Sequence, residues 1–182
     1  MARTHENRIF IPVRIAVLTI SDTRTFEDDV SGQILADGAA EAGHSLSARK
    51  IVADDIRAIR HVVRDWTNRD DLDVIISTGG TGLTGHDVTV EAMRPLFDKE
   101  IEGFASVFHA ISFAKIGTST IQSRATAGIM KGKYIFCLPG SPGAARDGWN
   151  DLLKPQLDYR HAPCNFVEIM PRLEEHVKRQ NM

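Results

Sequence analysis

The chain has 182 residues, of which 42% are hydrophobic and 25% charged, and its formal net charge is −2. This length and composition are typical of one globular domain with a sizeable core. The near-neutral charge argues against broad electrostatic binding of nucleic acid or of an anionic membrane. Two cysteines are too few for a disulfide framework, and Cys137, within an apolar run, is interpreted as a small buried residue.

The N-terminal segment does not have the pattern of a membrane span or a secretion signal. The apolar stretch from Ile9 to Ile20 is too short to cross a bilayer, Arg14 interrupts it, and a small-residue cleavage site does not follow. We therefore expect a cytoplasmic protein with a flexible arm over residues 1–13, a single domain over residues 14–170 and a polar tail over residues 171–182.

Strands and helices are predicted to alternate along the first half of the chain. Residues 14–20 form an apolar run that predicts a buried strand. The next helix is expected to be capped by Asp29 or Ser31 and to end at Gly43. The following elements are predicted to be a strand over residues 46–52, an amphipathic helix from Ile56 to Trp66 and a strand over residues 73–77.

The second half is expected to continue the alternation with shorter elements. Thr89 or Asp87 is predicted to cap a helix that runs through Met93. After it we expect a helix from Gly103, a short helix over residues 118–124, a hairpin of residues 129–130 and 134–138, and a helix near residues 144–153. The sequence from Pro155 onward is interpreted as polar and irregular.

This alternation predicts an α/β fold with a mainly parallel sheet and a small β-hairpin. In such sheets ligands bind beyond the carboxyl ends of the strands. The polar loops predicted to lie at that edge are Ser21-Asp22, Asp54-Asp55, Thr78 to Asp87, and Pro139 to Pro142. We therefore expect these loops to converge on one ligand site.

The loop after the third strand places glycines among hydroxyl groups, in the order Ser77-Thr78-Gly79-Gly80-Thr81-Gly82. Glycines let the backbone turn sharply and bring its N–H groups against a ligand, and such groups suit a phosphate. The alternative is a tight turn without a ligand. Gly80-x-Gly82-x-x-Gly85 also satisfies the dinucleotide fingerprint of nicotinamide-dependent oxidoreductases, but that motif normally follows the first strand.

Carboxylates are expected beside the same loop. Asp87 follows the glycines, and a carboxylate next to phosphate is repulsive unless a cation lies between them, which predicts Mg²⁺. The pair Asp54-Asp55 has two interpretations: an N-cap with a first-turn acid, or, together with Asp87, a site for Mg²⁺ on a triphosphate. The segment Gln122-Ser123-Arg124 offers further donors, either for an anion or as caps.

The glycine loop, followed by Asp87-Val88-Thr89 and later by Leu138-Pro139-Gly140-Ser141-Pro142, resembles the molybdopterin-binding family of molybdenum cofactor biosynthesis. The resemblance covers the chain from Ile15 to about Phe166. The segments that resemble the bacterial MoaB branch of this family, rather than its MogA branch, are residues 96–104, 116–125 and 162–166.

The resemblance implies a three-layer α/β/α sandwich and a nucleotidyl transfer. Family members with demonstrated chemistry use Mg²⁺ and ATP to adenylylate the terminal phosphate of molybdopterin, with release of pyrophosphate. By motif, Asp54 and Asp87 would be the catalytic and metal-binding residues. The resemblance further implies that Thr78, Gly79, Gly80, Thr81, Gly82 and Ser141 bind the molybdopterin phosphate, and that Ser21, Asp22 and Gly140 bind the nucleotide.

His86, preceded by Gly85, departs from the family pattern, because active members often have a basic residue before the aspartate. Histidine supplies less positive charge for a phosphate at neutral pH. The alternative function is therefore a non-catalytic carrier of molybdopterin or its precursor. The resemblance also implies a homo-trimer or homo-hexamer and hand-over of the product to a molybdate-inserting enzyme.

Overall fold

The computed structural model of the protein describes residues 3–4 and 7–175. Its centre is a six-stranded sheet in the order β3-β2-β4-β7-β6-β5. The strands of this sheet are β2 (Arg14–Ile20), β3 (Ser45–Val52), β4 (Val74–Thr78), β5 (Lys99–Glu100), β6 (Thr126–Met130) and β7 (Lys133–Leu138). A separate two-stranded ladder pairs β1 (Arg3–Thr4) with β8 (His161–Ala162).

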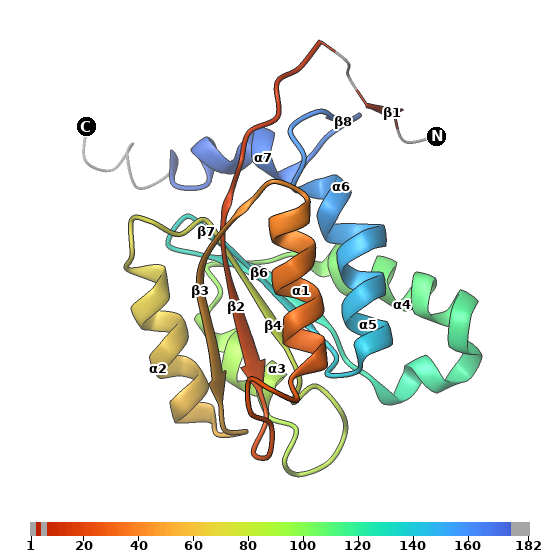
Figure 1. Cartoon of the computed structure of the whole chain (residues 1–182). Coiled ribbons are helices and arrows are strands. Elements are labelled where there is room, and N and C mark those ends of the chain that lie inside the picture. Colours follow the sequence, from red (N-terminus) through yellow and green to blue (C-terminus); the bar gives the residue numbers. More distant parts are fainter. Residues whose placement is uncertain (1–2, 5–6, 176–182) are drawn as a thin grey trace.

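Four neighbouring strands, β3, β2, β4 and β7, run parallel, and β6 is antiparallel to both β7 and β5. The β6–β7 hairpin turns at Lys131 and Gly132, whose φ angles are 48° and 70°. These pairings confirm the mainly parallel sheet and the hairpin, which is part of the main sheet. Because the parallel strands point the same way, the loops that follow them emerge at one edge, at the bottom of Figure 1.

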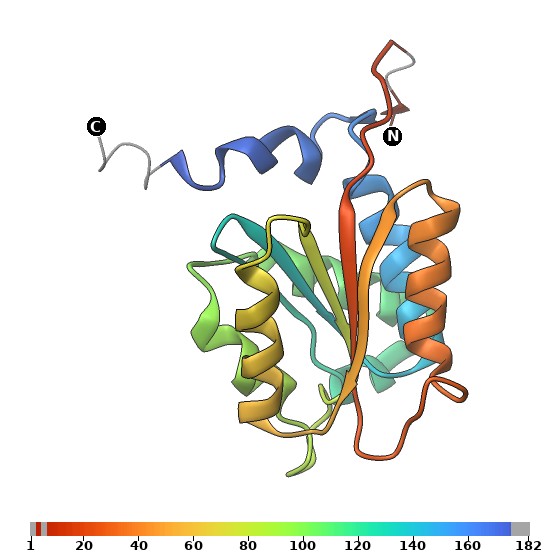
Figure 2. The same ribbon diagram turned by 60° about the vertical axis from the view of Figure 1, so that its left-hand side comes forward.

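Helices cover both faces of the sheet and give the three expected layers (Figures 1 and 2). One face packs against α1 (Val30–Glu41), α4 (Glu102–Ile116) and a continuous helix made of α5 (Pro142–Asp147), the π-helical η3 (Gly148–Leu153) and α6 (Lys154–Gln156). The other face packs against α2 (Ile56–Thr67), α3 (Thr89–Met93) and η1 (Arg94–Leu96).

The strands serve both cores because successive side chains point to opposite faces. In β2, Ile15 and Val17 pack with the α1 side, whereas Ala16, Leu18 and Ile20 pack with the α2 side. Burial on both faces explains why these strands appear as continuous apolar runs in the sequence.

The helix after the glycine loop differs from its prediction. The residue before α3 is Val88, which makes no side-chain cap, so neither Thr89 nor Asp87 caps this helix. Thr89 instead donates its hydroxyl to the Gly79 carbonyl at 2.8 Å. Thr89 therefore holds the glycine loop in place and does not cap the helix.

The prediction of an irregular chain beyond Pro155 is wrong. Leu157 and Val167 are buried in the α1-side core, and the chain forms α7 (Phe166–Ile169) and η4 (Met170–Arg172). These elements are too short to show a helical period, as is the 3₁₀ helix η2 (Gly117–Gln122), which takes the place of the short helix expected over residues 118–124.

Several expectations concern the ends of the chain and the cysteines. Of the predicted polar tail, residues 176–182 lie outside the described residues, and flexibility of the N-terminal arm stays a prediction. Cys137 is fully buried, as predicted, and burial raises the pKa of its thiol to about 12. In the part of the chain that the structure describes, no helix has the length and apolar character needed to cross a membrane.

Candidate functional site

The four polar loops meet where the parallel strands end and enclose a cavity of about 300 Å³. Its walls come from the loops after β2, β3, β4 and β7 and from the start of α1. The lining residues are Thr19, Ile20, Ser21, Arg24, Asp28, Asp29, Val30, Ser31, Asp54, Thr78, Gly79, Gly80, His86, Asp87, Gly140 and Pro142. The expected convergence of the loops is therefore confirmed.

Gly79 and Gly80 are required here by conformation and by space. Their φ angles are 103° and 62°, in the region that glycine adopts most readily. A Cβ on Gly79 would lie 2.2 Å from the Ile20 carbonyl oxygen, and one on Gly80 would lie 2.4 Å from Oδ1 of Asp54. Any side chain at these positions would therefore displace the end of β2 or the Asp54 carboxylate.

The hydrogen-bond donors of the glycine loop are only partly available to a ligand. The Gly79 amide donates to the Leu138 carbonyl at 3.1 Å, and the Thr78 hydroxyl donates to the Pro139 carbonyl at 3.0 Å. Within residues 3–4 and 7–175, the Gly80 amide has no protein acceptor. Gly80 lines the cavity, and an unpaired backbone N–H beside a cavity suits an anion, so the Gly80 amide is a candidate donor to a ligand.

Asp54 lies half-buried on the cavity wall, and its backbone N–H donates to Oδ1 of Asp22 at 3.1 Å. Burial raises the pKa of the Asp54 carboxyl, the negative charges of Asp22 and Asp87 raise it further, and His86 lowers it. The ionised form of Asp54 is thus disfavoured in the absence of a nearby cation.

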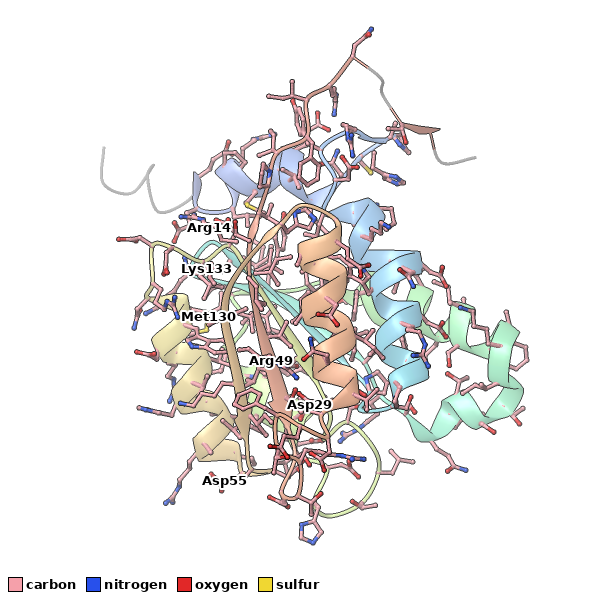
Figure 3. All side chains as sticks on the ribbon, in the orientation of Figure 1. Arg14, Asp29, Arg49, Asp55, Met130 and Lys133 are labelled. Atoms are coloured by element: carbon pink, nitrogen blue, oxygen red, sulfur yellow. The ribbon has the colours of Figure 1, made fainter. Side chains whose placement is uncertain are left out.

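Asp55 is the N-cap of α2, which is one of the two interpretations of the pair Asp54-Asp55. It caps α2 by accepting the Ala58 N–H at 2.8 Å, and its side chain is labelled beside the start of that helix in Figure 3. The cap and the cavity carboxylate are therefore two different residues, Asp55 and Asp54.

Asp87 reaches the cavity from the loop before α3. Thr84 donates both its backbone N–H (2.9 Å) and its hydroxyl (2.6 Å) to Oδ2 of Asp87. Burial acts to raise the pKa of Asp87, but these hydrogen bonds, together with Gly82 and the charge of Arg124, bring it below the ordinary value. Asp87 is therefore ionised at neutral pH, and its Oδ1 takes neither bond from Thr84.

The carboxylates of Asp22, Asp54 and Asp87 bring negative charge to one end of the site, and their repulsion contributes to the raised pKa of Asp54. Among the described residues, no group of three or more His, Cys, Asp or Glu forms a ready metal site. This donor set suits Mg²⁺, which is usually bound by one or two carboxylates while water and substrate phosphates supply its other ligands.

Some predicted site residues are not part of the cavity wall, namely Asp22, Thr81, Gly82 and Ser141. Thr81 is buried. The Ser141 hydroxyl accepts a backbone N–H of the first turn of α5 at 3.1 Å and so caps that helix. Asp22 accepts the Asp54 amide. Contacts of these four residues with a ligand stay predictions.

The start of α1 belongs to the site, although the sequence did not predict it there. Asp29, which is only 3% exposed, lines the cavity and caps α1 by accepting the Gly32 N–H at 2.9 Å. It also accepts the Thr19 hydroxyl at 2.7 Å and forms an ion pair with Arg49 of β3 at 3.0 Å. Figure 3 labels the side chains of Asp29 and Arg49. The capping pattern predicts that Asp29 begins a helix, but it does not predict the contacts of Asp29 with Thr19 and Arg49, which are distant in sequence.

The cavity wall carries more negative than positive charge. Its carboxylates are Asp28, Asp29, Asp54 and Asp87. Its basic side chains are Arg24, which pairs with Asp28 at 3.6 Å, and His86, which is 88% exposed. A phosphorylated ligand therefore needs a cation of its own to bind beside Asp54 and Asp87.

Comparison with known proteins finds relatives that match most of the chain. The family model described as "Probable molybdopterin binding domain" matches residues 16–159. Molybdenum cofactor biosynthesis protein B of Escherichia coli (strain K12) is 52% identical over 157 residues, which cover 86% of this chain and 92% of the relative.

Solved structures show the same fold. A crystal structure of molybdenum cofactor biosynthesis protein B has a TM-score of 0.83 at 41% identity, covering 92% of this chain and 99% of that one. The tungsten cofactor synthesizing protein MoaB from Pyrococcus furiosus has a TM-score of 0.69 at 30% identity, covering 93% and 96% of the two chains.

Proposed function

This chain belongs to the molybdopterin-binding family of molybdenum cofactor biosynthesis, in its MoaB branch, and we propose that it adenylylates molybdopterin with Mg·ATP. The observation that carries the proposal is that Asp54 and Asp87, which come from the loops after two different strands, line one cavity together with Gly80. The Asp54 carboxylate lies against Gly80, and the negative charge of Asp87 is near enough to raise the pKa of Asp54. That arrangement suits a phosphate with its cation better than it suits an uncharged ligand.

The proposed reaction transfers AMP without a covalent bond to the protein. A terminal phosphate oxygen of molybdopterin attacks the α-phosphorus of ATP and forms a new P–O–P bond. The bond from the α-phosphorus to the bridging oxygen breaks, and its electron pair leaves with pyrophosphate. Positioning and electrostatic stabilisation would supply the rate.

The residues of the cavity have distinct proposed roles. Asp54 and Asp87 would hold Mg²⁺, which offsets the negative charge of the phosphoryl groups when bound. The Gly80 amide donates to a phosphoryl oxygen. The Thr84 hydrogen bonds keep Asp87 ionised, so that this carboxylate does not have to lose a proton before the substrates bind.

The proposal is tested by formation of adenylylated molybdopterin from purified protein, molybdopterin, α-labelled ATP and Mg²⁺. Asp87→Asn and Asp54→Asn are each expected to lower kcat by at least about 100-fold, because each removes a charged metal ligand. Molybdopterin binding, measured by calorimetry, should survive in Asp87→Asn.

Asp55→Asn is the matched control, since it changes the residue next to Asp54 and Asn also caps helices well. Its activity should equal that of the wild type. Undiminished product from Asp87→Asn would refute the catalytic role of Asp87, and absence of product from the wild type would refute the adenylyltransferase.

A second candidate function is a non-catalytic carrier of molybdopterin or its precursor, favoured by the low positive charge of the cavity wall. His86 is almost fully exposed, and Arg24 is already paired with Asp28. Calorimetric titration with ATP, with and without Mg²⁺, separates the two functions. A carrier binds molybdopterin but binds ATP under neither condition.

We also propose that the chain assembles as a homo-trimer or homo-hexamer in the cytoplasm and passes its product to a molybdate-inserting enzyme. Support for assembly comes from exposed apolar side chains on α4 and η2, including Phe113, Ile116 and Ile121. Large apolar side chains exposed on neighbouring elements are typical of interaction sites. Hand-over follows from the chemistry, because a phosphoanhydride product needs a second enzyme to use it.

A further inference from the structure

Arg124, directly after η2, makes a dense set of contacts with the segment of residues 81–87. Its Nε donates to the carbonyls of Thr81 (3.1 Å) and Gly82 (3.0 Å), and its Nη2 donates to the carbonyl of Asp87 (3.0 Å). Its own backbone N–H also donates to Thr81 at 3.1 Å. The guanidinium group therefore joins both ends of this segment.

Glu91 of α3 fixes the guanidinium from the other side. Both carboxylate oxygens of Glu91 accept hydrogen bonds, one from Nη1 and one from Nη2 of Arg124, and the pairing holds the pKa of Glu91 below its ordinary value. An arginine fork that is paired in this bidentate way has little rotational freedom. Arg124 is thus anchored to a helix while its remaining donors reach the loop.

The segment between the two clamped ends has little other support. Residues 83–86 are exposed and lie outside any helix or strand. Within the segment, Asp87 donates its amide to the Thr84 carbonyl (3.1 Å) and receives the two hydrogen bonds of Thr84. Without an external tie, a loop of this kind opens at low free-energy cost.

We propose that Arg124 is a positioning residue of the site: by clamping the carbonyls of Thr81, Gly82 and Asp87, it holds the Asp87 carboxylate where it would bind the cation of the substrate phosphates. The inference deepens the proposed function and rests on it. It replaces the sequence interpretation of Arg124 as an anion donor or cap, because its donors already bind the loop and Glu91. A misplacement of about 1 Å at a phosphoryl-transfer site costs on the order of 100-fold in rate.

The test compares Arg124→Lys with the matched control Arg94→Lys. Lysine keeps the positive charge but cannot reach three carbonyls and a carboxylate from one planar fork. Arg94 pairs with Glu100 at 2.9 Å and, among the described residues, forms no hydrogen bond or ion pair with residues 81–87, so its replacement by lysine leaves the hydrogen bonds of Arg124 in place.

Hydrogen exchange of the peptide covering residues 82–88, measured in the ligand-free protein, is expected to be about 10-fold faster in Arg124→Lys and unchanged in Arg94→Lys. The kcat for adenylylation should fall by about 10- to 100-fold in Arg124→Lys. The Kd for molybdopterin should stay within about threefold of the wild type. A general loss of folding would instead impair both kcat and molybdopterin binding.

Two results would overturn the positioning role. One is wild-type exchange in the loop of Arg124→Lys. The other is a loss of molybdopterin affinity as large as the loss of kcat, which would make Arg124 a ligand-binding residue. A wild type that binds molybdopterin but transfers no AMP would refute the proposed function, and the exchange measurement would then decide alone whether Arg124 holds the loop.

Discussion

At the scale of single residues, Asp54 and Asp87 line the same cavity in opposite electrostatic environments. Burial and neighbouring carboxylates raise the pKa of Asp54, whereas hydrogen bonds from Thr84 outweigh burial and lower the pKa of Asp87. Asp54 therefore has an unfavourable charge in the free protein, and Asp87 has a stabilised one. A bound cation would relieve the strain at Asp54 most.

Asp54→Asn is expected to stabilise the free protein at pH 7 while it impairs catalysis. The folded pKa of Asp54 is raised, so its contribution to stability is fully present below the ordinary carboxyl pKa and is lost as pH rises through the folded pKa. Asparagine does not ionise and avoids this loss. We expect a Tm about 1–3 °C above the wild type at pH 7.

Calorimetric melting at several pH values checks this prediction. The difference in Tm should disappear below about pH 3, where the carboxyl is protonated in both the folded and the unfolded state. A variant that is less stable than the wild type at pH 7 would show that Asp54 is not under electrostatic strain.

At the scale of elements, the residue that caps α2 can be changed without changing the carboxylates of the cavity. Asp55 accepts the Ala58 N–H, whereas Asp54 faces the cavity. Asp55→Ala removes the cap and should lower the free energy of unfolding by about 0.5–2 kcal/mol, whereas Asp55→Asn should change it little. Urea unfolding measures both, and equal losses would contradict the assignment of the cap.

The elements that the sequence predicted correctly are those with strong local patterns. The β2 strand and the amphipathic helix α2 follow from apolar spacing, and the hairpin follows from the glycine-containing turn between two apolar runs. Short elements without a period were missed, such as α7 and η4. The prediction of a cap at Thr89 is wrong because its hydroxyl donates to the Gly79 carbonyl, which only the folding of the glycine loop brings within reach.

At the scale of the whole molecule, α4 and η2 expose several large apolar side chains. Phe113 and Ile116 are 58% and 55% exposed and lie three residues apart on α4, and Ile121 in η2 is 72% exposed. Figure 1 shows α4 on the right-hand periphery of the molecule, and neither α4 nor η2 contributes a residue to the cavity wall. Self-association through this surface would leave the cavity open.

Phe113→Glu is expected to reduce the wild-type oligomer to smaller species, because it places a charge in an apolar contact. Light scattering coupled to gel filtration measures the molar mass, and circular dichroism checks the fold. Ile9→Glu is the control, since Ile9 is also exposed, at 74%, but lies outside α4 and η2. A monomeric wild type would contradict the proposed assembly.

The sequence by itself determined the α/β class, the glycine loop and the acidic residues near it, because apolar spacing and glycine conformation are local properties of the chain. Only the tertiary structure decided which carboxylates share the cavity, that Asp55 caps a helix while Asp54 does not, and that Arg124 holds the loop. These assignments depend on contacts between residues as far apart as 43 positions in the chain. Burial and Coulomb interactions in the folded protein, which act through space, then set the pKa values of Asp54 and Asp87 in opposite directions.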